Sequence, residues 1–342
     1  MKSIILATAW IAQAAASSST TVLYAQPGGS LDLATHVFAN PTANHGKWPR
    51  FVNGTSIVFW QTHAGAALAI DTPTDADLSA QTRMPGPAVA PAQQALSAGG
   101  AATQGAQYAR GTLGLYLNTT GAREALTTAT IESSFMDGRK GCVPVWSGGA
   151  GDGLVVSLDL AAPTAAHCAR GRADGAPCAI YSTLSLNVHS RDFQHYMWYE
   201  TSLFDLDRPV LRDNILFDRS SQQPIVHGFV GTRGGPASRY NARVAGSAPA
   251  FNGTRATAQR LAWRVAAEHV ERAVADVKRR FNATGLPGDA RDWCVGGFNI
   301  ELEGTPATSA GVRVSNLALA ITRDAAHEAA GAAVLIDPGG SE

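Results

Sequence analysis

The sequence predicts an all-β protein, a β-sandwich with one accessory α-helix. Many short runs rich in β-branched and aromatic residues are separated by Gly and Pro turns, as in sandwich proteins. Within these runs apolar and polar residues alternate, which is the pattern of a half-buried strand. One segment, 255–281, instead places apolar residues at alternating steps of four and three, and this spacing predicts a helix. Because 45% of the 342 residues are hydrophobic, the chain can build a sizeable core.

The N-terminus has the layout of a secretory signal peptide. Lys2 precedes an apolar run, and small residues follow at 14–16. We therefore expect a signal peptide at 1–16, a secreted, extracellular protein, and a single β-sandwich domain over 17–342. The other interpretation is a buried first strand or helix. No other segment reaches transmembrane length, so no membrane partner is predicted.

Two further features agree with export. Four tripeptides fit the N-glycosylation pattern, and they begin at Asn53, Asn118, Asn252 and Asn282. Four cysteines are present, and an even number in an exported chain favours two disulfides with three possible connectivities. Cys168 and Cys178 flank a short polar loop and form the natural local pair, which leaves Cys142 to pair with Cys294.

No cofactor and no metal site is predicted, because the cysteine spacing fits no zinc pattern. Loops rich in Asp, at 206–208 and 212–214, could hold a structural Ca²⁺, but they lack the regular spacing of a calcium loop.

The first part of the domain contains short strand-like runs and one long interruption. Strands are expected near 21–24, 31–38, 56–60, 67–70, 112–117, 129–137 and 153–160. Between them, residues 72–111 are rich in Pro, Ala, Gly and Gln and contain almost no β-branched or aromatic residues. We expect this segment to be a long surface excursion.

The stretch 180–207 predicts a central hairpin. If its tip lies at Asp192 and Phe193, paired residue numbers sum to 385, and aliphatic and polar side chains separate onto two faces. One face is then core, with Leu184, Leu186, Val188, Met197, Tyr199 and Leu203. The other face carries Asn187, His189, Arg191, Gln194, Tyr196, Trp198 and Glu200. Asp-Phe is a poor two-residue turn, so a longer loop is expected.

The last third contains the helix and two clear strands. The helix stripe runs from Trp263 through Val270, Val274 and Val277, and Gly285 and Pro287 follow it. We expect this stripe to pack on the sandwich. In the next strand, Phe298, Ile300 and Leu302 alternate with Asn299, Glu301 and Glu303.

Composition and missing motifs exclude several functions. The net charge of +0 gives no indication of a nucleic-acid partner. The chain contains no GxxxxGK[ST], no GxGxxG between a strand and a helix, no HExxH and no GxSxG. Nucleotide binding and the commonest zinc and serine hydrolase mechanisms are therefore disfavoured.

The chain resembles the secreted concanavalin A-like lectin and glucanase superfamily in its tandem strands over 129–207 and in its closing run, WCVGGFNIELEG to VRVSNLALAI. The resemblance implies a jelly-roll sandwich with a polysaccharide or glycan as partner. Many glucanases of that superfamily carry a Glu-x-Asp-x-x-Glu signature on one strand. The nearest approach here, at Glu132, does not match it.

Two kinds of catalysis suit the predicted polar surface. Hydrolysis needs one protonated and one ionised carboxyl group. Glu200 and Glu132 are the best candidates by strand position, followed by Asp137, Asp205 and Glu301. The resemblance also implies a lyase mechanism, in which His189 would be the base and Tyr196 the acid, while Asn187, Arg191 and Gln194 neutralise a uronate carboxylate.

Two non-catalytic functions remain open. Trp198 and Tyr196 on a flat sheet can stack on sugar rings and bind a glycan as a lectin does. A structural surface or cell-wall protein also fits the Ala and Gly content. The sequence favours a secreted polysaccharide lyase or glycoside hydrolase over these alternatives.

Overall fold

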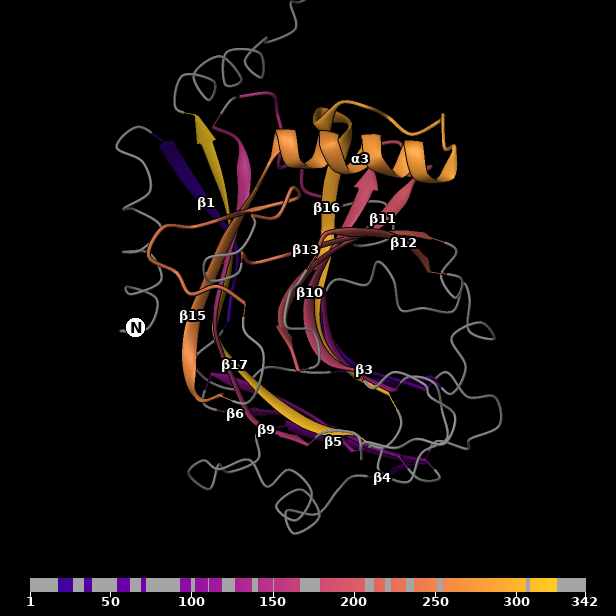
Figure 1. Ribbon diagram of the computed structural model, residues 1–342, viewed down its shortest axis with the longest axis vertical. Helices are drawn as coiled ribbons and strands as arrows, with labels where there is room; N and C mark the ends of the chain where they lie inside the picture. Colours follow the sequence, from indigo (N-terminus) through magenta and orange to yellow (C-terminus); the bar gives the residue numbers. More distant parts are fainter. Residues whose placement is uncertain are drawn as a thin grey trace, which may run out of the picture.

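The computed structural model describes residues 19–26, 111–117, 128–136, 141–149, 151–162, 179–206, 212–218, 223–231, 237–250, 255–305 and 308–323 in full, and the backbone alone of further strands and strand ends. These residues form two β-sheets packed face to face with one α-helix beside them (Figure 1). The predicted β-sandwich with one accessory helix is therefore confirmed over the described residues.

The first sheet has nine strands in the order β14-β15-β9-β17-β7-β6-β5-β4, with β1 paired to β17. Its strands are β1 (Ser18–Ala25), β4 (Ala69–Asp71), β5 (Gln93–Gly99), β6 (Ala102–Ala109), β7 (Thr112–Asn118), β9 (Gly153–Ala166), β14 (Ala242–Arg243), β15 (Arg255–Ala266) and β17 (Ser309–Asp324).

The second sheet has eight strands in the order β12-β13-β11-β10-β16-β8-β3-β2. Its strands are β2 (Ala34–Phe38), β3 (Gly54–Gln61), β8 (Thr127–Ser134), β10 (Ile180–Ser190), β11 (Tyr196–Asp205), β12 (Asn214–Asp218), β13 (Gln223–Phe229) and β16 (Trp293–Gly304). Both sheets bend, and the eight-stranded sheet lies on the inside of the bend, so its outer face is concave (Figure 1).

The hairpin β10–β11 has the register that the alternation predicts. Pairs such as Val188 with Met197 and Asn187 with Trp198 sum to 385, and a bulge changes the register only beyond Thr183. The connection is the five-residue loop 191–195, longer than a two-residue turn, and Phe193 in it has a positive φ of 59°. The aliphatic face of this hairpin is fully buried and packs into the core between the two sheets.

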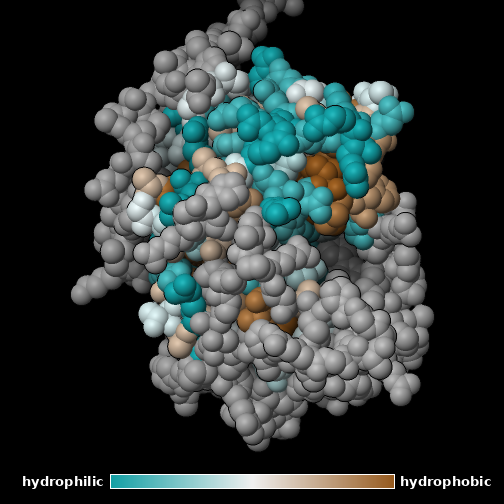
Figure 2. All heavy atoms as spheres, viewed as in Figure 1, coloured by the Kyte–Doolittle hydropathy of each residue, from teal (hydrophilic) through white to brown (hydrophobic). Residues whose placement is uncertain are grey.

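The helix is shorter than predicted. Helix α3 spans Ala267–Phe281, and residues 255–266 form strand β15 instead. In LAWRVA the large apolar residues Leu261, Trp263 and Val265 alternate along the strand and are all buried, although Trp263 also falls on the predicted helical stripe. The predicted packing of Val270, Val274 and Val277 is confirmed, because all three are at most 1% exposed. Figure 2 shows the outward side of α3, which carries Glu268, Glu271, Arg272, Arg279 and Arg280, as a hydrophilic band.

The predicted excursion at 72–111 is also partly wrong, because β5 and β6 lie inside it as an antiparallel pair in the nine-stranded sheet. These strands are built mostly from Ala, Gln, Gly and Ser, so strand propensity gave little indication of them, and sheet context decided the conformation instead. Among the described residues, no helix is long and apolar enough to cross a membrane. The proposed signal peptide at 1–16 lies outside the described residues.

Candidate functional site

The concave side of the eight-stranded sheet is lined by polar side chains. Side chains that alternate with the core positions on five neighbouring strands point to this side, and we call this set the polar face. It comprises Thr128, Thr130, Glu132 and Ser134 of β8, Tyr181, Thr183, Ser185, Asn187 and His189 of β10, Tyr196, Trp198, Glu200 and Ser202 of β11, His227 of β13, and Asn299, Glu301 and Glu303 of β16. Most of these residues are at most 8% exposed, which is unusual for so many polar groups.

Four carboxylates gather on the polar face. The register places Glu200, Ser185, Asn299 and Glu132 in one row across β11, β10, β16 and β8. Glu301 and Glu303 follow on β16, because residues two apart on a strand share a face. Adjacent strands lie about 4.8 Å apart, so the four carboxylates fall within a patch about three strand spacings wide.

Glu301 is held by neighbouring polar groups. The Asn299 side-chain amide donates a hydrogen bond to Glu301 Oε1, and the Glu301 carboxyl group also hydrogen-bonds Glu303. Burial, and then the negative charges of Glu303 and Glu200, raise the pKa of Glu301 well above its usual value. Glu301 is therefore the group of this cluster that keeps its proton as the pH rises.

Glu303 and Tyr181 extend this pair. Thr128 Oγ1 donates to Glu303 Oε1 at 3.1 Å, and Tyr181 also hydrogen-bonds the Glu303 carboxylate. Burial is the main reason why the pKa of Glu303 is raised. Burial, followed by the charge of Glu303, likewise raises the pKa of the Tyr181 hydroxyl. One proton shared between Glu301 and Glu303 relieves the repulsion between two carboxylates on the same strand.

Glu200 has a different environment from Glu301. His227 lies beside it on the parallel neighbour strand β13, and His227 Nδ1 is 3.1 Å from Glu200 Oε2. The other ring nitrogen, His227 Nε2, is 2.6 Å from the Ser202 hydroxyl. The two sides of the cluster thus differ, with a carboxyl pair on β16 and a carboxylate–imidazole pair on β11 and β13.

Several buried polar atoms of the polar face have no hydrogen-bond partner among the described residues. These atoms are Thr130 Oγ1, Thr183 Oγ1, Ser185 Oγ and Asn299 Oδ1, on the adjacent strands β8, β10 and β16. Leaving such an atom unpaired typically costs about 1–3 kcal/mol. In folded proteins such atoms are ordinarily satisfied by other protein groups, by ordered water or by a ligand.

An aromatic group adjoins the carboxylates at the loop end of the hairpin. The rings of His189 and Tyr196 have centroids 4.7 Å apart, and Tyr196 meets Trp198 edge to face at 5.0 Å. Tyr196 donates its hydroxyl proton to Asn187 Oδ1 at 3.1 Å. His189, Tyr196, Trp198, Asn187 and Glu200 therefore share one face, as the hairpin register predicts.

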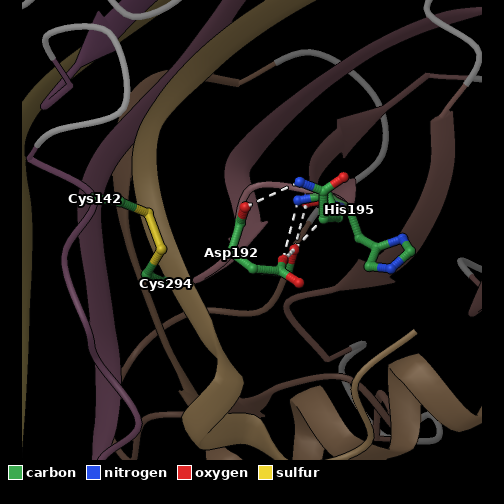
Figure 3. Close-up of a disulfide and its surroundings, with 6 residues drawn as sticks. Cys142, Asp192, His195 and Cys294 are labelled. Atoms are coloured by element: carbon green, nitrogen blue, oxygen red, sulfur yellow. Dashed lines mark hydrogen bonds between the residues drawn. A yellow bond between two sulfur atoms is a disulfide. The ribbon is translucent and has the colours of Figure 1, made fainter. Parts of the chain in front are cut away.

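Arg191 and Gln194 do not join this face. Both lie exposed in the loop 191–195, where the Gln194 backbone N–H donates to Asp192 Oδ1 at 3.0 Å. Figure 3 shows this loop, with Asp192 hydrogen-bonded inside it and the His195 ring directed away from the disulfide. The predicted substrate-binding role of these two residues was based on extending the strands through the turn, where strand alternation no longer holds.

Of the other acids named from the sequence, Asp205 is buried at the end of β11 and Asp137 lies outside the described residues. Sequence reasoning missed Glu303, His227 and Ser202 as members of the cluster. Alternation along 298–303 was the available signal for Glu303. No local pattern marks His227, because its position depends on the parallel pairing of β13 with β11.

The disulfide Cys142–Cys294 is confirmed, with an S–S distance of 2.08 Å (Figure 3). It ties the segment before β9 to the start of strand β16, and the register pairs Cys294 with His189. Cys168 and Cys178 lie outside the described residues. Of the four glycosylation asparagines, Asn282 is exposed at the C-cap of α3, whereas Asn53, Asn252 and the side chain of Asn118 lie outside the described residues.

Among the described residues, no group of three or more His, Cys, Asp or Glu side chains is arranged to hold a metal ion. The carboxyl, imidazole and hydroxyl groups of the polar face can transfer protons and stabilise charge.

Comparisons with known proteins found similarity only at the level of structure. No model of a protein family matches the sequence, and a search of curated proteins gave no match. Among solved structures, the family 11 xylanase from Neocallimastix patriciarum matches with a TM-score of 0.32 and 12% identity, over 77% of this chain and 98% of the xylanase.

Two further structures give similar values. The family 12 xyloglucanase from Bacillus licheniformis has a TM-score of 0.34 and 8% identity, over 68% of this chain and 94% of its own. The xyloglucanase domain of NopAA from Sinorhizobium fredii has a TM-score of 0.30 and 9% identity, over 76% and 97%.

Proposed function

We propose that this protein hydrolyses glycosidic bonds of a neutral polysaccharide, with carboxyl groups of the polar face as acid and base. The observation that carries the proposal is the gathering of Glu132, Glu200, Glu301 and Glu303 on one concave sheet face. Glycoside hydrolysis needs two carboxyl groups in different protonation states, and their different surroundings on β16 and β11 supply that difference.

The roles follow from these surroundings. Glu301, which retains its proton, is the general acid and donates that proton to the glycosidic oxygen as the bond to the anomeric carbon breaks. Glu200, which contacts His227, is the second carboxyl group and in this proposal acts as the carboxylate that stabilises the positive charge developing on the sugar ring. Water then adds to the anomeric carbon, and its proton passes to a carboxylate, so that the acid is restored and a new reducing end is released.

A neutral substrate is favoured over an acidic one by charge. The described polar face carries four carboxyl groups and contains no Lys or Arg. Arg191, which was predicted on this face, lies in the loop instead. A lyase needs a group that neutralises a uronate carboxylate, and the described polar face offers no Lys or Arg side chain for this purpose. The unpaired hydroxyl and amide atoms suit sugar hydroxyls, and Trp198 and Tyr196 suit the faces of sugar rings.

Export of the protein belongs to the same proposal. The Cys142–Cys294 disulfide persists in an oxidising compartment, and an extracellular polysaccharide would be met there.

The test is release of reducing ends from a panel of neutral and acidic polysaccharides. Glu301→Gln and Glu200→Gln are each expected to lower turnover by about 10²–10⁴-fold, the usual effect of a lost acid–base group. Glu268→Gln, on the exposed side of α3, is the matched control and should leave turnover unchanged. Unsaturated products that absorb in the ultraviolet would instead indicate a lyase. Binding without any product, abolished by Trp198→Ala, would indicate a lectin.

A further inference from the structure

We infer that His227 is a positioning residue, which holds the Glu200 carboxylate in its working orientation while Ser202 fixes the imidazole ring. This inference rests on the proposed function, because it assigns a purpose to the partner of the ionised carboxylate. Neither His227 nor Ser202 needs to touch the substrate, because both act through Glu200.

The geometry places these three side chains in one chain of contacts. Glu200 and Ser202 are two residues apart on β11 and so share a face, and His227 is the register partner of Glu200 on β13. Nδ1 of His227 is 3.1 Å from Glu200 Oε2, and Nε2 is 2.6 Å from Ser202 Oγ. The side chains of His227 and Glu200 are only 10% and 16% exposed, so water competes weakly for these contacts.

The chemistry of the partners fixes the tautomer of the ring. An ionised carboxylate can only accept hydrogen bonds, so His227 Nδ1 must carry a proton to bind Glu200. In the neutral ring Nε2 then has a free lone pair, and the Ser202 hydroxyl can donate to it. The opposite tautomer would direct a lone pair at the carboxylate and leave that contact repulsive.

Among the described register partners of His227, Glu200 is the one that carries an ionisable side chain. On β12, the register partner of His227 is Asn214, which does not titrate. On β10, Ser185 is the partner of Glu200. The other titratable groups of the face, Glu132 on β8 and Glu301 and Glu303 on β16, lie beyond β10 in the sheet. The imidazole therefore contacts Glu200 directly, and its other ring nitrogen contacts Ser202 rather than the carboxyl pair on β16.

Ser202, His227 and Glu200 also resemble the nucleophile, base and orienting acid of a serine hydrolase. That mechanism requires free N–H donors for the oxyanion beside the serine. Strand β11 is paired to β10 on one side and to β13 on the other through Ser202, so its backbone is engaged in the sheet. This pairing favours the positioning role over a nucleophilic Ser202.

Two amide substitutions separate the two nitrogens of the ring. His227→Asn places an amide nitrogen near the position of Nδ1 and can still donate to Glu200. His227→Gln places its amide near the position of Nε2, toward Ser202. We expect His227→Asn to retain activity within about tenfold of the wild type and His227→Gln to lose about 10–100-fold, a loss below that of a group directly involved in proton transfer. The acidic limb of the kcat/KM profile should move to higher pH in the Gln variant and less in the Asn variant.

A second measurement does not depend on activity. The ¹⁵N spectrum of the wild-type imidazole should show a proton on Nδ1 of His227 whether the ring is neutral or charged. A neutral ring protonated on Nε2 would overturn the inference, and so would covalent labelling of Ser202 by a fluorophosphonate. Equal losses in the Asn and Gln variants of an active enzyme, with an unchanged pH profile, would overturn the inference alone. A wild-type protein with the Nδ1 proton but no hydrolysis of any polysaccharide would overturn the proposed function alone.

Discussion

Asp276 of α3 anchors the loop that supports the candidate site from behind. Its carboxylate accepts a hydrogen bond of 2.8 Å from the Tyr240 hydroxyl, and the Tyr240 carbonyl in turn accepts one from Tyr199 of β11. The same loop packs against β13 so closely that a Cβ on Gly228 would meet Ser238 Oγ at 2.9 Å. Gly228 follows His227, so a series of contacts leads from the helix through the loop to the site. We therefore predict that Asp276→Ala destabilises the protein markedly.

The size of the loss follows from the exposure of the partners. Arg239 and Arg279 also contact Asp276, but their side chains are 54% and 72% exposed, so these ion pairs contribute only about 0–1 kcal/mol each. The Tyr240 hydroxyl is buried and donates to a charged group, and such a bond is worth about 1.5–3 kcal/mol. We expect a loss of about 2–4 kcal/mol in the free energy of unfolding, carried mainly by Tyr240.

Urea denaturation of three single variants and one double variant checks this reasoning. Arg279→Ala, which removes only an exposed partner, should lose less than about 1 kcal/mol. Tyr240→Phe combined with Asp276→Ala should lose less than the sum of the two single variants, because both remove the same bond. An Asp276→Ala loss no larger than that of Arg279→Ala, or strict additivity with Tyr240→Phe, would refute the assignment.

Four further outcomes are expected. Val274→Asp places a charge in the core beside the sheets and should destabilise by about 3 kcal/mol or more in urea, whereas a loss below about 0.5 kcal/mol would place this helix face in solvent. Glu301→Gln should be more stable than the wild type above pH 4.5, because burial and nearby carboxylates raise the pKa of Glu301 in the folded protein. The stability of the wild type then falls as the pH rises through that folded-state pKa, and a wild type that is equally stable at mildly alkaline and acidic pH would contradict this. Cys142→Ser should cost about 2–5 kcal/mol, and an unchanged urea midpoint would contradict a stabilising disulfide. In protein secreted from a glycosylating host, enzymatic deglycosylation should convert Asn282 to Asp, and an unmodified peptide would contradict its use as an acceptor.

Period-two alternation was enough to predict the hairpin but not the helix boundary. In β10 and β11 the aliphatic and polar residues separate in the 385 register and in registers shifted by two residues, so the two faces followed from the sequence, and the structure has the 385 pairing. At 261–266 the same residues satisfy a strand and a helix, because Trp263 is buried in either arrangement. The pairing of β15 with β9 resolved this ambiguity, and that pairing is a tertiary interaction.

The candidate site was predictable strand by strand but not as a whole. Each strand shows its polar side in the sequence, including Asn299, Glu301 and Glu303 on β16. The strand order β13-β11-β10-β16-β8 cannot be predicted from local sequence, and it is this order that brings Glu132 and His227 to one face. Long-range pairing of this kind determines the cluster. Arg191 and Gln194 were predicted to share the face, but they lie in the local loop 191–195, where strand alternation does not apply.

The polar face is unfavourable for folding, and this bears on its purpose. Buried carboxyl groups that repel one another, together with buried hydroxyls without partners, lower the free energy of unfolding. The opposite side of the same strands carries Leu184, Leu186 and Ile300, which are fully buried in the core. Their burial stabilises the sheet and offsets the cost of the polar side. Substituting the polar side with apolar residues would remove the unpaired groups, so a chain that needed only stability has no reason to keep them. The concentration of these unfavourable groups on the concave face is therefore an argument for a ligand or reaction at that face, independent of any likeness to known enzymes.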